Sequence, residues 1–159
     1  MEHDKQLREQ LAKVMDWNEA HADLAAAVSD FPAKLRGRVP DGLPYSAWQL
    51  LEHMRIALWD ILEFSRDAKH KSPEWPEGYW PKKAAPPNEA AWEKSVSSIR
   101  ENLEAMRKLI SDPKHDLVAP LPHGSGQTLL RQTLLIADHN AYHIGQLVLV
   151  RKALGAWKG

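Results

Sequence analysis

The sequence predicts an all-α protein, a four-helix bundle, on three observations. Four segments of about twenty or more residues repeat apolar side chains at three- and four-residue steps, the period of a helix with one buried face. No segment sustains the alternation of apolar and polar residues expected of a half-buried strand, and stretches rich in proline and glycine separate the four segments. In a chain of 159 residues, four such helices are typical of one helical bundle. We therefore expect residues 1–159 to form a single domain.

The first two predicted helices are separated by the stretch FPAKLRGRVPDGLPY. The first spans residues 5–29 and ends where this stretch begins, because prolines and glycines interrupt a helix. The second begins after Ser46, where Ser46 and Gln49 match the S-x-x-Q pattern of a capping box. It continues through AWQLLEHMRIALWDILEF.

The third and fourth predicted helices also have recognisable ends. The third begins at Asn88, a favourable N-cap residue directly after two prolines, and runs to about Ile110. The fourth starts after Gly126, extends to about Leu154 and is followed by Gly155.

The fourth helix is expected to be the most buried of the four. Between residues 129 and 150 it carries two formal charges, Arg131 and Asp138. At 100° per residue one apolar stripe forms, made of Leu130, Thr133, Leu134, Ala137, Ala141, Ile144 and Val148. Within the motif DHNAYHIGQ, His139 and His143 lie on the flank of this stripe.

The connection between the second and third helices, residues 68–87, is unusually long. It reads AKHKSPEWPEGYWPKKAAPP, whereas connections in bundles usually have about two to eight residues. A helix of about twenty residues spans about 30 Å, which a chain of this length covers, so the second and third helices can run parallel. The aromatic residues Trp75, Tyr79 and Trp80 favour a segment that lies over the bundle, either as a cover for the core or as a wall of a substrate pocket.

Composition excludes several classes of protein. Lys+Arg and Asp+Glu number 21 each, so the chain lacks the basic surplus of a nucleic-acid or membrane-surface protein. The absence of cysteine excludes disulfides, thiolate metal sites and a cysteine nucleophile. The first ten residues, MEHDKQLREQ, are too charged for a signal peptide, and no uncharged apolar run reaches about 18 residues. We expect a cytoplasmic protein without nucleic-acid or membrane partners.

Three histidines form a candidate metal site. His139 and His143 are four residues apart and lie on one helix face, with Cβ atoms roughly 5–6 Å apart. His53 occupies a comparable position at the margin of the apolar stripe of the second helix. If these helices pack about 8–10 Å apart, the three imidazoles can converge. Such a set suits zinc, nickel, iron or cobalt and leaves an open coordination position. The spacing lacks the glutamate of H-E-x-x-H, so metalloprotease chemistry is not indicated.

The other five histidines are not expected to bind metal. His21 is interpreted as packed or partly exposed, and His123, in the turn PHGSGQ, as a turn residue in preference to a pocket residue. His3, His70 and His115 lie in polar or loop contexts and receive no role. Groups on the two helices that could support the ligands are Gln49, Asp60, Asp138, Asn140 and Gln146.

Three stretches of the chain together resemble the DinB-like superfamily of metal-binding four-helix bundles. They are LLEHMRIALWDILEF, EWPEGYWP and GQTLLRQTLLIADHNAYHIGQLVLVRKALGAW. The resemblance implies an up-down-down-up bundle, a divalent metal ion held by His53, His139 and His143, and a homodimer. It also implies a possible activity, because some members are metal-dependent S-transferases or isomerases that use bacillithiol, mycothiol or glutathione.

Two functional hypotheses follow, and a third reading stays open. In the first, the protein is a metal-dependent enzyme that activates a small nucleophile, a low-molecular-weight thiol or water, as a transferase or hydrolase on a small-molecule substrate. The thiol would come from a cosubstrate, because the chain has no cysteine. In the second, the bundle binds or senses metal without catalysis, and the ion stabilises the fold. In the third, the histidines pack without metal. No motif names the metal (zinc, nickel or iron), the substrate or a catalytic residue.

Overall fold

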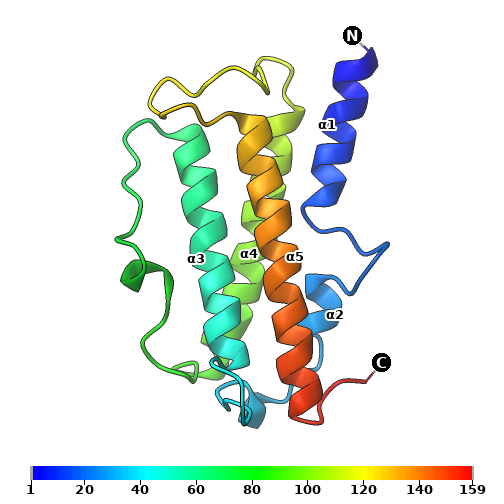
Figure 1. The fold of residues 1–159 in the computed structure, drawn as a ribbon, viewed down its shortest axis with the longest axis vertical. Coiled ribbons are helices and arrows are strands. Elements are labelled where there is room, and N and C mark those ends of the chain that lie inside the picture. Colours follow the sequence, from blue (N-terminus) through cyan, green and yellow to red (C-terminus); the bar gives the residue numbers. More distant parts are fainter. Residues whose placement is uncertain (1, 159) are drawn as a thin grey trace.

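The computed structural model describes residues 2–158, and over these residues the chain is helical without a β-sheet (Figure 1). This confirms the predicted all-α class. Two short 3-10 turns, η1 (Ala33–Leu35) and η2 (Glu77–Tyr79), lie in the connections. The α-helices are α1 (Glu2–Val14), α2 (Leu24–Val28), α3 (Ala47–Arg66), α4 (Glu89–Ser111) and α5 (Leu129–Ala153). Within the described part of the chain, none of these helices is long and apolar enough to cross a membrane.

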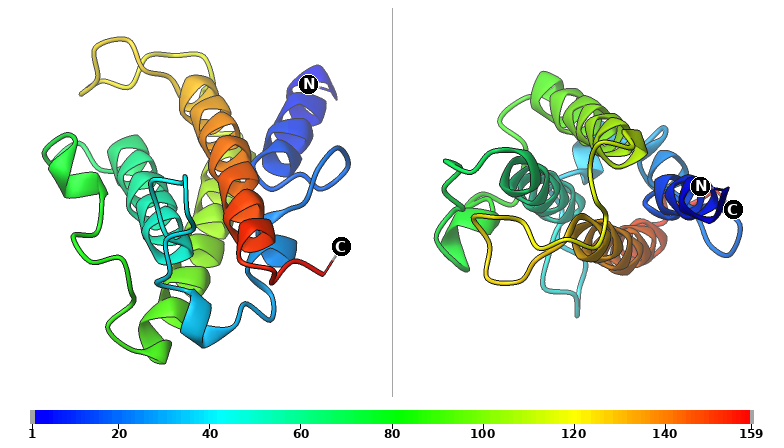
Figure 2. Two further views of the ribbon diagram at one scale, coloured as in Figure 1. Left: turned by 60° about the horizontal axis from the view of Figure 1, so that its bottom comes forward. Right: turned by 90° about the horizontal axis from the view of Figure 1, so that it is seen from above.

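The four long helices form a bundle with the expected up-down-down-up order. Helices α3 and α4 run parallel, and α1 and α5 run in the opposite direction (Figure 1). Both α1 and α3 pack against α4 and against α5, so α1 and α3 lie on a diagonal of the bundle (Figure 2). The connection from α3 to α4 returns along the outside of α3 to the end where α4 begins. Its length is what makes the parallel pair possible.

The core lies between these helices, and α3 and α4 contribute most of it. Burial of their apolar side chains is the main force that holds the bundle together. The largest fully buried side chains come from α3, α4 and the segment between α1 and η1: Trp92, Phe31, Met15, Leu50, Leu51, Met54, Leu58, Leu62, Ile99, Leu103, Met106 and Ile110.

Local signals set the starts of α3 and α4 where the sequence predicts them. The Ser46 side chain accepts a hydrogen bond from the Gln49 backbone N–H, and the Gln49 side chain accepts one from the Ser46 N–H, which completes the capping box. The Asn88 side chain accepts from the Ala91 N–H at 2.8 Å. Gly155, with φ of +67°, follows the end of α5 in the left-handed conformation that favours glycine.

The prediction of one helix over residues 5–29 is wrong, because this segment forms two helices, α1 and α2. Contacts from distant helices hold the C-terminal end of α1. Arg107 of α4 donates to the carbonyl of Ala12, and Asn140 of α5 donates to the buried carbonyl of Met15. The Asp23 side chain then accepts a hydrogen bond at 2.7 Å from a backbone N–H in the first turn of α2 and begins a new helix.

The buried face of α5 also differs from the predicted stripe. Leu134 and Ala141, expected to be buried, are exposed. The buried face includes Ile136, Asn140 and Leu147, so the flank assigned to the histidines is the one that faces the core. Because α5 is apolar around much of its circumference, its sequence period does not determine which side packs inward.

Candidate metal centre

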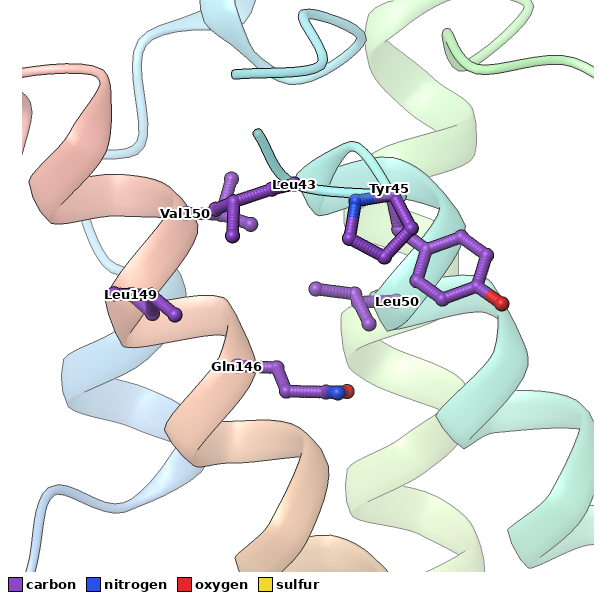
Figure 3. A pocket seen from close by; sticks show the side chains of 7 residues that line it. Leu43, Tyr45, Leu50, Gln146, Leu149 and Val150 are labelled. Atoms are coloured by element: carbon purple, nitrogen blue, oxygen red, sulfur yellow. The ribbon is translucent and has the colours of Figure 1, made fainter. Parts of the chain in front are cut away.

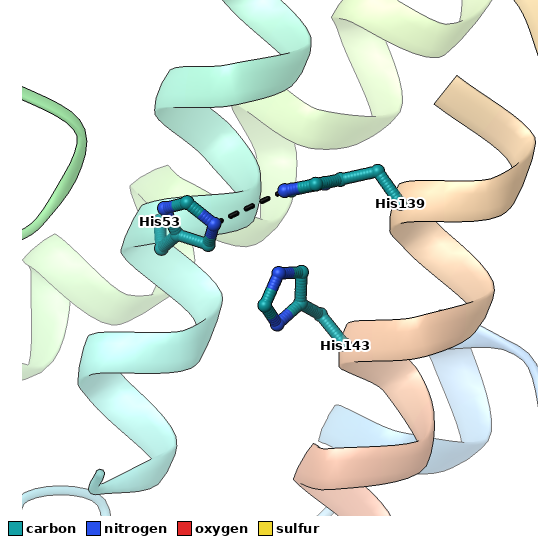
Figure 4. Close-up of side chains that lie close together, drawn as sticks. All are labelled: His53, His139 and His143. Atoms are coloured by element: carbon teal, nitrogen blue, oxygen red, sulfur yellow. Dashed lines mark hydrogen bonds between the residues drawn. The ribbon is translucent and has the colours of Figure 1, made fainter. Parts of the chain in front are cut away.

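Three histidines from two helices converge in the structure (Figure 4). His53 extends from α3, and His139 and His143 extend from α5. The Nε2 atoms of His53 and His139 are 3.0 Å apart. One ring nitrogen from each histidine lies within 4.8 Å of the other two. The convergence inferred from the helical phase of these residues is therefore present.

The spacing of the nitrogens is compatible with one metal ion. Two imidazole nitrogens that each lie about 2.0–2.1 Å from an ion are about 2.9–3.4 Å apart, depending on the angle between the bonds. The 3.0 Å between His53 and His139 falls in this range. The remaining separations, up to 4.8 Å, are longer, and small rotations about the side-chain torsions of histidine can shorten them.

Hydrogen bonds orient two of the three rings. The Nδ1–H of His53 donates to the carbonyl oxygen of Tyr79 at 2.9 Å, and the Nδ1–H of His143 donates to Oε1 of Gln146 at 2.7 Å. A carbonyl oxygen can only accept, so in each ring the proton lies on Nδ1 and the lone pair lies on Nε2. Metal-binding histidines in proteins are commonly held in this way by their second nitrogen.

Burial keeps the three imidazoles neutral. It lowers the pKa of His139 to about 3, and the nearby His143 and His53 contribute to this shift. Burial also lowers the pKa of His143 to about 4, against the opposing effect of its bond to Gln146, and lowers that of His53. At neutral pH all three rings are thus in the form that binds metal.

The long connection between α3 and α4 forms one wall of the cluster. The indole of Trp80 stacks on the imidazole of His53, with ring centroids 3.9 Å apart and an interplanar angle of 2°. On the same segment, the carbonyl of Tyr79 holds the other edge of that imidazole. Trp75, the third aromatic residue singled out in this segment, is largely exposed. The segment thus contributes Tyr79 and Trp80 to the cluster.

A buried carboxylate anchors this wall to α3. Asp60 accepts hydrogen bonds from the Tyr79 hydroxyl at 2.6 Å and from His70 Nε2 at 2.7 Å. Burial and the bond to Asp60 raise the pKa of Tyr79 to about 12, so the phenol remains a donor. The polar context of His70 in the sequence does not indicate this role. The sequence feature that could have indicated a link to the cluster is Asp60, because it lies seven residues after His53 and hence on the same face of the helix.

The remaining histidines singled out from the sequence lie outside the cluster. His123 Nε2 donates to the backbone carbonyl of Phe64 at 2.6 Å, which fits the interpretation as a turn residue. His21 is exposed, and its ring is bonded to the adjacent backbone. The triad within residues 2–158 thus consists of His53, His139 and His143.

Of the five candidate supporting groups, two are connected to the cluster. Gln146 contacts His143 directly, and Asp60 acts on His53 through Tyr79. The other three have other contacts or face solvent: Gln49 belongs to the capping box, Asn140 bonds to the end of α1, and Asp138 is exposed.

The bundle and its histidine cluster define a helical protein with a candidate metal centre, and a comparison of sequences identifies its family. The family model described as DinB superfamily matches residues 16–147. The chain therefore belongs to the DinB superfamily, as the resemblance indicated, and all three histidines lie within the matched region. No curated protein and no solved structure matches the chain.

Proposed function

We propose that His53, His139 and His143 bind one divalent transition-metal ion and that the protein is a metal-dependent enzyme. The observation that supports this most directly is the number of ligands. Within residues 2–158 the cluster consists of three histidines, without a fourth histidine or carboxylate. Structural zinc sites normally have four protein ligands, whereas catalytic sites have three and keep one position for water or substrate.

The residues around the cluster have separate roles in this proposal. Tyr79 and Gln146 orient the imidazoles of His53 and His143, and Trp80 shields one face of His53 from water. A bound ion supplies Lewis acidity and lowers the pKa of a coordinated water molecule or thiol. Since the chain has no cysteine, a thiol nucleophile would be a low-molecular-weight cosubstrate. The proposed reactions are thiol S-transfer to a small molecule, or hydrolysis of one.

A second candidate function is a non-catalytic metal-binding bundle. It is favoured by the position of the cluster, because the ligands join α3 to α5 across the packing interface. An ion at this position would hold the two helices together, and its binding free energy would add to the stability of the fold. The metal would then serve the structure or a sensing role.

Metal titration tests the binding that both functions require. The protein is purified without a nickel column, stripped with a chelator and titrated with Zn²⁺, Co²⁺, Ni²⁺ and Fe²⁺ under anaerobic conditions. We expect one equivalent of at least one of these ions to bind, and His139→Ala to weaken binding by at least about 100-fold because two imidazoles remain. His21→Ala, which changes an exposed histidine, is the matched control. Less than about a tenth of an equivalent bound would contradict both functions.

Turnover distinguishes the two functions. The metal-loaded protein is incubated with a panel of electrophiles and bacillithiol, mycothiol or glutathione, and separately with esters and amides without thiol. His53→Ala serves as the blank. Metal-dependent turnover supports the enzyme. Absence of turnover, together with a melting temperature that falls by tens of degrees on metal removal, supports the structural ion.

A further inference from the structure

An apolar pocket lies between α3 and α5, the two helices that carry the clustered histidines (Figure 3). Its volume is about 60 Å³. One water-sized group needs roughly 10–15 Å³, so the pocket can hold a short alkyl group of about four such units. None of the side chains that line the pocket carries a formal charge. The lining residues are Leu43, Pro44, Tyr45, Leu50, Gln146, Leu149 and Val150.

The pocket is about one helical turn from the histidine cluster. Leu50 precedes His53 by three residues on α3, and Gln146 follows His143 by three residues on α5. Because α3 and α5 are antiparallel (Figure 1), both steps lead toward the same end of the bundle. Three residues of helix rise about 4.5 Å, so one small molecule can reach from the cluster into the pocket.

Two contacts connect the pocket to the cluster. Gln146 lines the pocket, and its Oε1 accepts the Nδ1–H of His143, which leaves the amide N–H groups for a ligand or water. Tyr45 lines the opposite wall and stacks on Trp80, with centroids 4.2 Å apart, and Trp80 in turn stacks on His53. The walls of the pocket are therefore continuous with the groups that hold the imidazoles.

We infer that this pocket binds a short apolar group of the substrate, while the polar, reacting end of the same molecule lies at the open position of the metal. The inference rests on the proposed function and adds the chemical class of the substrate. The site takes a small molecule in which an alkyl or similarly apolar group of about three to five carbons adjoins a metal-binding polar group. An uncharged, apolar lining does not suit the charged parts of a thiol such as glutathione, so we assign the pocket to the electrophile.

A series of hydroxamates tests the inference. A hydroxamate binds a transition metal through two oxygens, so acetohydroxamate probes the metal alone and longer alkylhydroxamates extend from the metal into the pocket. Binding to the Co²⁺-loaded protein is followed by its visible spectrum. We expect affinity to rise about threefold to fourfold for each added methylene and to level off when the alkyl chain fills the pocket.

Two leucines of α5 provide a matched pair of variants. Leu149 lines the pocket and is 51% exposed, whereas Leu134 is 50% exposed and lies outside it. Leu149→Ala should reduce the affinity gain of pentanohydroxamate over acetohydroxamate by several-fold and leave acetohydroxamate binding unchanged. Leu134→Ala should change neither.

The outcomes separate this inference from the proposed function. If no hydroxamate, acetohydroxamate included, changes the cobalt spectrum, the open metal position is absent and the proposed function fails. If acetohydroxamate binds but longer chains gain nothing, or if the gain is the same in Leu149→Ala, the inference about the pocket is wrong while the metal centre stands.

Discussion

Each of the three clustered histidines depends on a different neighbour. His53 is held by the Tyr79 carbonyl, His143 by Gln146, and His139 contacts His53 itself. The rings of His53 and His143 are oriented through Nδ1 before any ion binds, which reduces the entropy that metal binding must overcome.

Asp60 should influence metal affinity without touching the metal. In Asp60→Asn the carboxylate that accepts from Tyr79 and His70 is lost, so the segment that holds His53 is less firmly fixed. We expect the metal affinity to fall by about tenfold, the lower end of the range for groups that support ligands. Competition with a chromophoric chelator measures it.

The control is Asp138→Asn, which removes an exposed carboxylate of α5. Circular dichroism establishes that both variants are folded. Equal affinities in the two variants would show that Asp60 does not act on the cluster.

The metal-free protein should lose stability as the pH falls below about 6.5. In the unfolded chain the histidines have a pKa near 6.5, whereas in the folded chain burial lowers the pKa of His143 to about 4 and that of His139 to about 3. Between these values the unfolded state binds more protons, so the free energy of unfolding decreases with falling pH. Urea unfolding at pH 7.0, 5.5 and 4.5 measures this.

Replacement of one clustered histidine isolates its share of this pH dependence of stability. His139→Ala should show a shallower decrease in stability between pH 6.5 and 4.5 than the unchanged chain. Identical profiles would mean that His139 is not held neutral in the fold.

The histidine triad could be predicted from the sequence, but its surroundings could not. The i, i+4 spacing of His139 and His143 and the helical phase of His53 are local properties, and they led to residues that converge. The pairing of Asp60 with His70 depends on the path of an irregular segment, which no periodicity describes.

Helix boundaries show the same distinction at the level of elements. The starts of α3 and α4 could be predicted because Ser46 and Asn88 bond to the backbone of their own first turns. The end of α1 could not, because it depends on Arg107 and Asn140, which lie in helices far along the chain. The inward face of α5 was likewise decided by packing, since apolar residues surround much of that helix.

The two N-caps should differ in their contribution to stability. Asn88→Ala removes one capping bond and should lower the free energy of unfolding by about 1 kcal/mol. Ser46 is buried, and its hydroxyl also donates to the carbonyl of Ala84 at 2.5 Å. Ser46→Ala should therefore cost about 2–3 kcal/mol, because it also leaves that carbonyl without its donor. Chemical denaturation of both variants measures the difference, and equal costs would show that the Ala84 contact contributes nothing.

At the scale of the whole molecule, the long connection between α3 and α4 determines both topology and site. It allows the two helices to run parallel, and it brings Tyr79 and Trp80 against His53. The length of this connection, which is visible in the sequence, predicts that α3 and α4 can run parallel. The contact of Tyr79 and Trp80 with His53 could not be predicted in this way, because it depends on the tertiary fold.

The homodimer implied by the resemblance stays a prediction. The outer face of α5 exposes Leu134 and Tyr142, and this apolar surface is where we expect a second copy to pack. Light scattering should give twice the chain mass of 18.0 kDa. Tyr142→Glu should shift the mass toward the monomer, whereas Trp75→Glu, which changes a similarly exposed aromatic residue of the connection, should not. A monomer before any substitution would contradict the dimer.

The distance between the histidines along the chain has a consequence for biosynthesis. His53 and His139 are separated by 86 positions, so the ribosome adds this length of chain after His53 before the two side chains can meet. Until α5 is available, the growing chain offers at this place one imidazole of the triad, that of His53. If the triad binds an ion as proposed, we expect the complete site to take up metal after α5 has been made and not while the preceding helices are being synthesised.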